Sequence, residues 1–126
     1  MVREFAQKHN VILVLKGERT LIGSPDGRVV VNPTGNSGLG KGGNGDTLTG
    51  IITGFIAQTL ASQNNNWGSF IAPTTLELIF KAVVSAVYTA GLAGDFAERK
   101  FGKRAMNATD VRNCLQSAIA SLKDEG

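Results

Sequence analysis

The chain contains very little cysteine, histidine or clustered charge. Its single cysteine, Cys114, excludes a disulfide framework, and its place on the apolar side of a helical pattern indicates a buried structural thiol. The single histidine, His9, ends a polar segment, where we expect it to be solvated. Thirteen basic and ten acidic residues are scattered without a block of five like charges, which argues against a nucleic-acid partner.

Membrane and export signals are also lacking. The segment from Met1 to His9 is too polar for a signal peptide, and no apolar run reaches membrane-spanning length. We therefore expect a soluble cytoplasmic protein without a membrane partner. The 126 residues suffice for a single domain with one modest core.

The first part of the chain predicts a short helix and three strands. Val2 to Lys8 is expected to be helical. Val11 to Leu15 is a continuous apolar run, typical of a strand buried on both faces in a parallel sheet. Leu21-Ile22 and Val29 to Val31 are two further predicted strands, and Pro25-Asp26-Gly27 between them predicts a turn.

A helix is predicted to begin at Asp46, where the apolar pattern changes to a period of 3.6 residues. Gly50 and Gly54 lie inside this helix, and each costs about 1 kcal/mol relative to alanine. We therefore expect them to permit close packing against a neighbouring element. The apolar face is predicted to consist of Leu48, Ile51, Ile52, Phe55 and Ile56.

Two further helices are predicted in the second half of the chain. Ala61 to Thr75 is polar and is expected to be a surface loop, and Leu76 to Ala93 a largely buried helix. Asp95 to Met106 is expected to be a charged connector in which a short helical piece can form. The last helix is expected to have Thr109 as its N-cap and Asp110 near the positive end of its dipole. Its buried stripe is predicted to contain Val111, Cys114, Leu115, Ala118, Ile119 and Leu122.

This layout lacks a second long strand to flank the first one. A strand that is buried on both faces needs neighbouring strands and covering helices. We therefore expect residues 1–126 to form a single partial domain, the C-terminal half of a larger α/β domain.

The glycines are concentrated in one place, since half of the sixteen lie between Gly35 and Gly54. Glycine lets backbone N–H groups approach a ligand closely, and a following helix start directs free N–H groups and a positive dipole end at an anion. The run ends in Asp46, which is either a helix cap or a reactive group beside a phosphate.

Three phosphate-binding motifs are possible interpretations of this glycine-rich segment. The spacing Gly35-x-x-x-x-Gly40-Lys41 approaches a P-loop, but Gly42 stands where Ser or Thr should hold magnesium. Gly38-x-Gly40-x-x-Gly43 matches a dinucleotide fingerprint by letter, but no acidic residue follows about twenty positions later. The pattern favours the third, in which the amides of residues 42–45 hold a phosphate chain and Asp46 takes a proton from a substrate hydroxyl.

Four segments in order carry a family resemblance: Val14 to Thr20, Asn32 to Asn36, Gly42 to Gly50, and Gly91 to Asp95. Together they resemble the NAD(P)H-hydrate dehydratases of the ribokinase-like superfamily. The resemblance implies the C-terminal half of a ribokinase-like three-layer α/β/α domain. It also implies a lyase that repairs hydrated NADH or NADPH, with ADP or ATP as phosphoryl donor and Mg²⁺ as the accompanying ion.

The resemblance also implies roles for particular residues. Asp46 would be the catalytic base and would contact the hydrated substrate. The segment Lys16 to Thr20 and the loop Asn36 to Gly45 would bind the nucleotide. The implied nucleotide-binding residues are Lys16, Gly17, Glu18, Arg19, Thr20, Asn36, Ser37, Gly38, Leu39, Gly40, Lys41, Gly42, Gly43, Asn44 and Gly45.

The chain departs from its relatives at two places. Gly40-Lys41 stands where relatives commonly carry Ala-Thr, so that Lys41 is either a further cation beside the phosphates or a solvated side chain. Ala90 stands where relatives often have a histidine, so any role of that histidine is absent here.

Two alternatives keep other functions open. A ribokinase-like kinase for a small molecule would use the same acid but release a stable phosphorylated alcohol. A nucleotide-binding or oligomer-forming module would not be an enzyme, and apolar surface left without a partner would drive it to associate. For the whole chain we expect a homo-oligomer or association with an N-terminal half.

Overall fold

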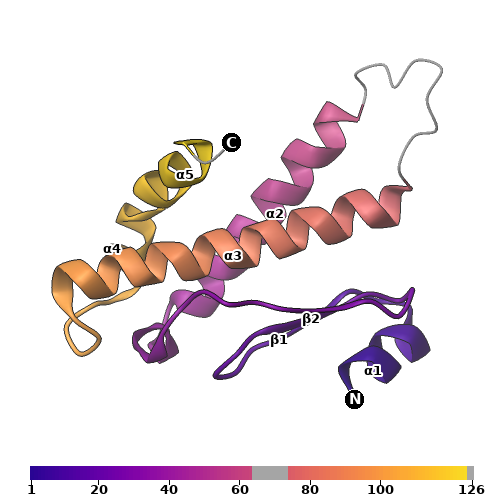
Figure 1. Cartoon of the computed structure of the whole chain (residues 1–126), viewed down its shortest axis with the longest axis horizontal. Coiled ribbons are helices and arrows are strands. Elements are labelled where there is room, and N and C mark those ends of the chain that lie inside the picture. The colour runs from indigo at the N-terminus through magenta and orange to yellow at the C-terminus, as the bar shows by residue number, and fades with distance from the viewer. Residues whose placement is uncertain (64–73, 125–126) are drawn as a thin grey trace.

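The computed structural model describes residues 1–63 and 74–124 of the chain. The elements in order are α1 (Val2–His9), β1 (Leu13–Leu15), β2 (Leu21–Gly23), β3 (Val29–Val31), the 3-10 helix η1 (Ser37–Gly40), α2 (Asn44–Ser62), α3 (Thr75–Phe101), α4 (Ala108–Asn113) and α5 (Leu115–Asp124). The small sheet lies between α1 on one side and the long helices α2 and α3 on the other (Figure 1). The described residues therefore form an α/β arrangement in three layers.

The sheet is an antiparallel meander in the order β1-β2-β3, with Ile22 opposite both Val14 and Val30. The predicted parallel strand buried on both faces is wrong, because β1 runs antiparallel to β2 and Leu15 is 37% exposed. Residues 16–20 are too few for the crossover that parallel neighbours require.

The predicted turn between β2 and β3 is confirmed. The Gly27 N–H donates to the Ser24 carbonyl at 3.0 Å, and Gly27 adopts a φ of 98° that favours glycine. The Arg28 guanidinium donates to the Asp26 carboxylate at 2.8 Å. This hydrogen bond is the main cause of a lowered pKa for Asp26.

Helix α1 is confirmed and covers one face of the sheet. A side chain on Gly23 would collide with Val2, so the absence of a Cβ there lets α1 approach β2. On the other face, the buried residues Ile22, Phe80 and Val83 form the core between the sheet and helices α2 and α3. The predicted apolar face of α2 contributes Leu48, Ile52 and Ile56 to the same core.

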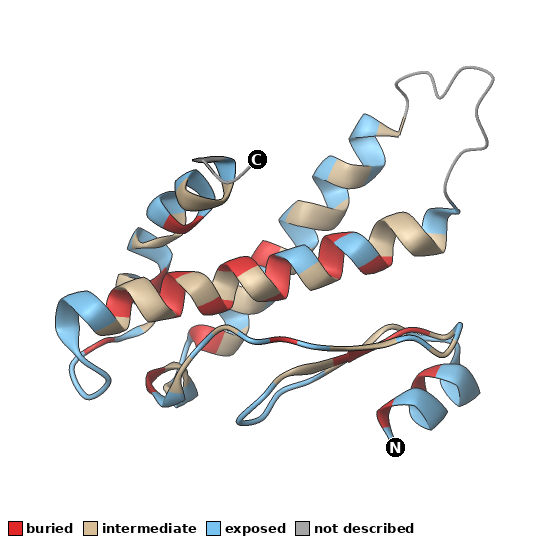
Figure 2. Cartoon of the chain, in the orientation of Figure 1, coloured by how far each residue is buried: buried red, intermediate tan, exposed pale blue. Residues whose placement is uncertain are grey.

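Helix α3 is longer than predicted, because the expected connector from Asp95 onward continues as helix to Phe101. Its buried face extends through Ala93 and Ala97 and packs against Met106, and this packing sustains the helix beyond the predicted end. By length and composition α3 could cross a membrane, which the sequence analysis did not predict. Within the fold, 44% of the apolar window in α3 is buried, and buried residues alternate with half-buried and exposed ones along the helix (Figure 2).

The C-terminal helix begins with a different cap from the predicted Thr109. The Asn107 side chain accepts from the Asp110 N–H at 3.0 Å, and the Asp110 carboxylate accepts from the Asn107 N–H at 2.9 Å. Asn107 is the cap in place of Thr109 because its capping box with Asp110 satisfies two N–H donors at the helix end. The helix is divided at Cys114, which is half-buried, and Ile119 of the predicted stripe is 46% exposed.

Two predictions about α2 need correction. The helix continues through Ser62 and Thr74 caps α3, so the predicted loop Ala61 to Thr75 is too long, and its residues 64–73 lie outside the described residues. Gly50 and Gly54 permit no close packing among the described residues, since nothing lies within 4 Å of a Cβ built at either.

Candidate functional site

The glycine-rich loop runs from β3 past α3 to the start of α2. Its only regular structure is η1, and it turns into α2 at Gly43, whose φ of 91° favours glycine. The helix begins at Asn44, two residues before the predicted start. The first-turn N–H groups of a helix have no partner within it, so this helix end can bind an anion.

A cavity of about 1050 Å³ lies between the loop, the β1–β2 connection and α3. It brings together the two segments that were predicted to bind the nucleotide, although they are well separated in sequence. The predicted residues that line it are Lys16, Gly17, Glu18, Arg19, Thr20, Asn36, Ser37, Leu39, Gly40, Lys41 and Asn44.

The cavity also has charged residues that the sequence analysis missed. Glu98 lines it from the end of α3 and Lys103 from the segment that follows, and the two form an ion pair at 3.6 Å. They belong to no recognised motif, and they were assigned to a connector. Only the unexpected length of α3 brings them to the cavity.

Four predicted nucleotide-binding glycines, Gly38, Gly42, Gly43 and Gly45, are outside the cavity lining. Gly38 is buried, and a side chain there would collide with the Met106 sulfur, so this glycine permits packing. Gly45 lies beside Lys16, whose Nζ is 3.5 Å from the position of a Cβ on Gly45. The Lys16 ammonium group therefore lies near the N-terminus of α2.

Asp46 is exposed and occupies the third position of α2. It lines a second cavity of about 870 Å³, together with Phe55, Leu115 and Ile119. Thr47 lines both cavities, so the start of α2 lies between them. The side-chain hydrogen bonds of this first turn come from Asn44 and Thr47, and within residues 1–63 and 74–124 none involves the Asp46 carboxylate.

Lys41 lines the cavity and is half-buried, and backbone carbonyls bind its ammonium group. Its ammonium group donates to the carbonyl oxygens of Arg104 and Met106, the latter at 2.6 Å. Lys41 thereby ties the end of η1 to the segment between α3 and α4.

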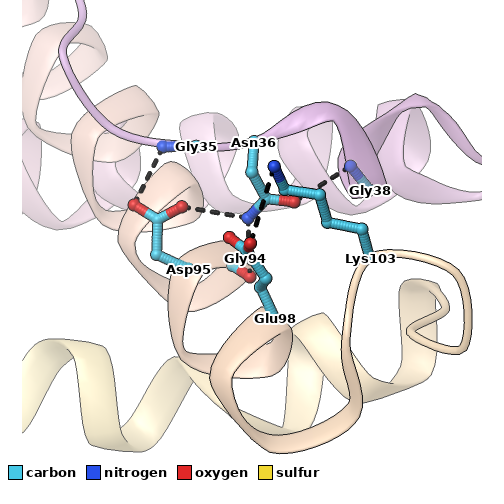
Figure 3. Close-up of polar contacts among 7 residues, drawn as sticks. All are labelled: Gly35, Asn36, Gly38, Gly94, Asp95, Glu98 and Lys103. Carbon is cyan, nitrogen blue, oxygen red and sulfur yellow. Dashed lines mark hydrogen bonds and ion pairs between the residues drawn. The ribbon is translucent and has the colours of Figure 1, made fainter.

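The start of the loop is held by α3 (Figure 3). The Asp95 carboxylate accepts from the Gly35 N–H at 3.1 Å and from Asn36 Nδ2 at 2.9 Å. Asn36 Nδ2 also donates to the Gly94 carbonyl at 3.1 Å, and Asn36 Oδ1 accepts from the Gly38 N–H at 2.9 Å. The segment Gly91 to Asp95 thus contacts the loop directly.

A glycine-rich loop that opens a helix beside a cavity with more basic than acidic residues defines an α/β protein with an arrangement that can bind an anion. Residues 1–117 match the sequence profile of a carbohydrate-kinase-like family described as NAD(P)H-hydrate dehydratase. The chain belongs to the NAD(P)H-hydrate dehydratase family.

Individual relatives agree with this assignment. The chain is 38% identical over 122 residues to the bifunctional NAD(P)H-hydrate repair enzyme Nnr of Moorella thermoacetica, covering 97% of this chain and 20% of that protein. It is 52% identical over 54 residues to the ADP-dependent (S)-NAD(P)H-hydrate dehydratase of Bacillus subtilis, covering 43% of this chain and 20% of that protein.

A solved structure shares the fold. It is the ADP/ATP-dependent NAD(P)H-hydrate dehydratase from Bacillus subtilis, co-crystallised with ATP and Mg²⁺, with a TM-score of 0.74 and 31% identity. The match covers 95% of this chain and 37% of that one. The ribokinase-like α/β fold predicted from the sequence is therefore confirmed. The chain spans about a fifth of the length of the Moorella thermoacetica relative and well under half of the solved Bacillus subtilis chain.

Proposed function

We propose that this chain provides the nucleotide-binding and catalytic segment of an ADP- or ATP-dependent NAD(P)H-hydrate dehydratase. Family membership supports the reaction class, and the names of the relatives support the nucleotide. The hydroxyl of the hydrated nicotinamide ring would receive the terminal phosphoryl group. Elimination of phosphate would then restore NADH or NADPH.

In the first step, the ring hydroxyl oxygen bonds to the terminal phosphorus and the bond from that phosphorus to the bridging oxygen of the nucleotide breaks. The carboxylate of Asp46 takes the hydroxyl proton. In the second step, the ring carbon–oxygen bond breaks and inorganic phosphate departs with its electron pair. Water takes a proton from the neighbouring ring carbon, and the electrons of that C–H bond form the ring double bond.

The first cavity is the proposed place of the nucleotide. Phosphoryl transfer depends mainly on positioning and on stabilisation of charge. Lys16 and Arg19 line the cavity, and Lys16 lies near the N-terminus of α2. We assign the phosphates to this helix end, at the border of the cavity, with the amides of Gly42, Gly43 and Gly45 as donors. The Asn44 N–H already donates to the Lys41 carbonyl at 3.4 Å.

Mg²⁺ fits this site as a companion of the nucleotide. In the described part of the chain, no group of three or more His, Cys, Asp or Glu side chains could hold a metal ion. Mg²⁺ is often held by one or two carboxylates and by substrate phosphates. Glu18 and Glu98 line the cavity and could supply a carboxylate, and the ion would neutralise phosphate charge.

One observation carries the catalytic assignment. Asp46 is an exposed carboxylate in the first turn of α2, and it caps no N–H group among the described residues. Asp110 has the same third position in α4 and does cap its helix. A structural role therefore accounts for Asp110 but leaves Asp46 unexplained.

The test compares the wild-type protein, as its source encodes it, with Asp46→Asn in an assay that follows NADH formation from its hydrate with ADP or ATP. Loss of the base should lower kcat by about 100-fold or more. Asp26→Asn is the matched control, because Asp26 lies on the β2–β3 turn away from both cavities.

Full activity of Asp46→Asn would contradict the role of Asp46. A stable phosphorylated alcohol in place of NADH would instead assign the chain to the small-molecule kinases of the same fold. Calorimetric titration of the chain with ADP and with ATP measures nucleotide binding separately from the chemistry.

A further inference from the structure

The shape of the glycine-rich loop depends on a side chain from a distant helix. Between β3 and α2 the loop has one short 3-10 helix, η1, and its N-cap is Asn36. The shape of the Asn36 amide does not distinguish its two flipped orientations, since its oxygen and nitrogen are nearly equal in size. The hydrogen-bond partners therefore determine which atom faces which way. A carboxylate only accepts, so Asp95 holds Nδ2 toward α3, together with the neutral Gly94 carbonyl, and this directs Oδ1 at the Gly38 N–H.

The same carboxylate also holds the backbone one residue earlier. Its second oxygen accepts from the Gly35 N–H at 3.1 Å. Asp95 thus controls the loop at Gly35 directly and at Gly38 through Asn36. The two contacts follow one another along the chain, so the start of η1 is fixed relative to α3 (Figure 3).

Asp95 acts from behind the loop and does not line the cavity. Gly91 and Glu98, about one turn before and after it on α3, both line the cavity, as do Gly35 and Asn36. Asp95 itself is half-buried and lies outside the lining. Its carboxylate therefore accepts hydrogen bonds from the loop and does not face a ligand in the cavity.

We infer that Asp95 is a positioning residue for the nucleotide loop, and this inference rests on the proposed function. Asp95 orients Asn36, Asn36 caps η1, and η1 presents the loop to the cavity. A charge-assisted hydrogen bond contributes more than a neutral one, so a neutral isostere should loosen the loop even if it keeps the shape of the side chain.

The test uses Asp95→Asn in the full chain, with Asn36→Ala as a second variant and Asp26→Asn as the control. Amide hydrogen exchange is measured by NMR at Gly35 and Gly38, and the Kd for ADP by calorimetry. Asp95→Asn should speed exchange at both glycines and raise the Kd by about tenfold. Asn36→Ala should speed exchange at Gly38 but leave Gly35 protected, because the Gly35 bond to Asp95 remains.

The amides of α1 serve as an internal reference and should be unchanged in both variants. Unchanged exchange at Gly35 and Gly38 in Asp95→Asn would overturn the inference, as would faster exchange with an unchanged Kd for ADP. If Asp95→Asn fails to fold, Asn36→Ala tests the inference instead. Faster exchange at Gly38 with Gly35 still protected supports it, and the same change in exchange at both glycines overturns it. If the wild type binds neither ADP nor ATP, the proposed function fails. The exchange rates at Gly35 and Gly38 then test separately whether Asp95 holds the loop.

Discussion

At the scale of single residues, two aspartates occupy the third position of a helix and have different surroundings. Asp110 exchanges two hydrogen bonds with Asn107 at the start of α4. Asp46 stands behind Gly43, which has no side chain to complete such a box. Asp46 and Asp110 thus have the same position in their helices. The N-cap residue three positions earlier determines whether the carboxylate forms a capping box.

This difference predicts effects of different size on stability. Asp110→Ala should lower the free energy of unfolding by about 1 kcal/mol, because the capping box is lost. Asp46→Ala should change it by less than about 0.5 kcal/mol, apart from a small loss of helix-dipole stabilisation. Urea unfolding followed by circular dichroism measures both. A large loss of stability in Asp46→Ala would mean that this carboxylate has a structural role after all.

At the scale of elements, glycines in helices serve close packing, but not the glycines that the sequence analysis chose. In α3, a side chain on Gly91 would collide with Thr34 and one on Gly94 with Leu39, so α3 can approach the loop only through these glycines. In α2, Gly50 and Gly54 face open space among the described residues. A glycine inside a helix signals close approach only where another element lies over it.

Alanine substitutions should therefore have opposite signs in the two helices. Gly54→Ala should raise the free energy of unfolding by about 1 kcal/mol, since alanine favours helix and meets no neighbour. Gly94→Ala should lower it by about 1–3 kcal/mol, because the new methyl group overpacks Leu39. Thermal and urea unfolding measure the free energy of unfolding of both variants relative to the wild type. A destabilised Gly54→Ala would show that something does pack on that face of α2.

At the scale of the whole molecule, the three-stranded sheet has two free edges. In the part of the chain that the structure describes, no further strand pairs with the outer edge of β1 or of β3. Both edges carry apolar side chains, with Leu15 37% and Val31 51% exposed. Unpaired edges of this kind promote pairing with another chain.

We accordingly expect the isolated chain to associate as its concentration rises, in keeping with the expected homo-oligomer or association with an N-terminal half. Val31→Lys should weaken this association, because a charged edge residue opposes strand pairing. Gln116→Lys on the exposed side of α5 is the control for added charge. Sedimentation velocity over a range of concentrations measures the effect, and a wild-type monomer throughout would contradict the expectation.

The predictable parts of the fold are those with local causes. The β2–β3 turn follows from Pro25-Asp26-Gly27, and the apolar face of α2 follows from its period. The direction of β1 was missed because a continuous apolar run resembles a parallel strand, whereas the length of the next connection decides the pairing. The end of α3 was missed because burial of Ala97 against Met106 outweighs the local charge.

Within the site, local sequence is enough to predict the glycine-rich loop, the carboxylate that follows it, the segment from Lys16 to Thr20, and the family. These depend on the order and type of neighbouring residues. The folded chain adds three contacts: Lys16 lies beside Gly45, backbone carbonyls bind Lys41, and Asp95 holds Asn36. Such contacts join segments far apart in sequence, so their geometry exists only after the helices have packed on the sheet.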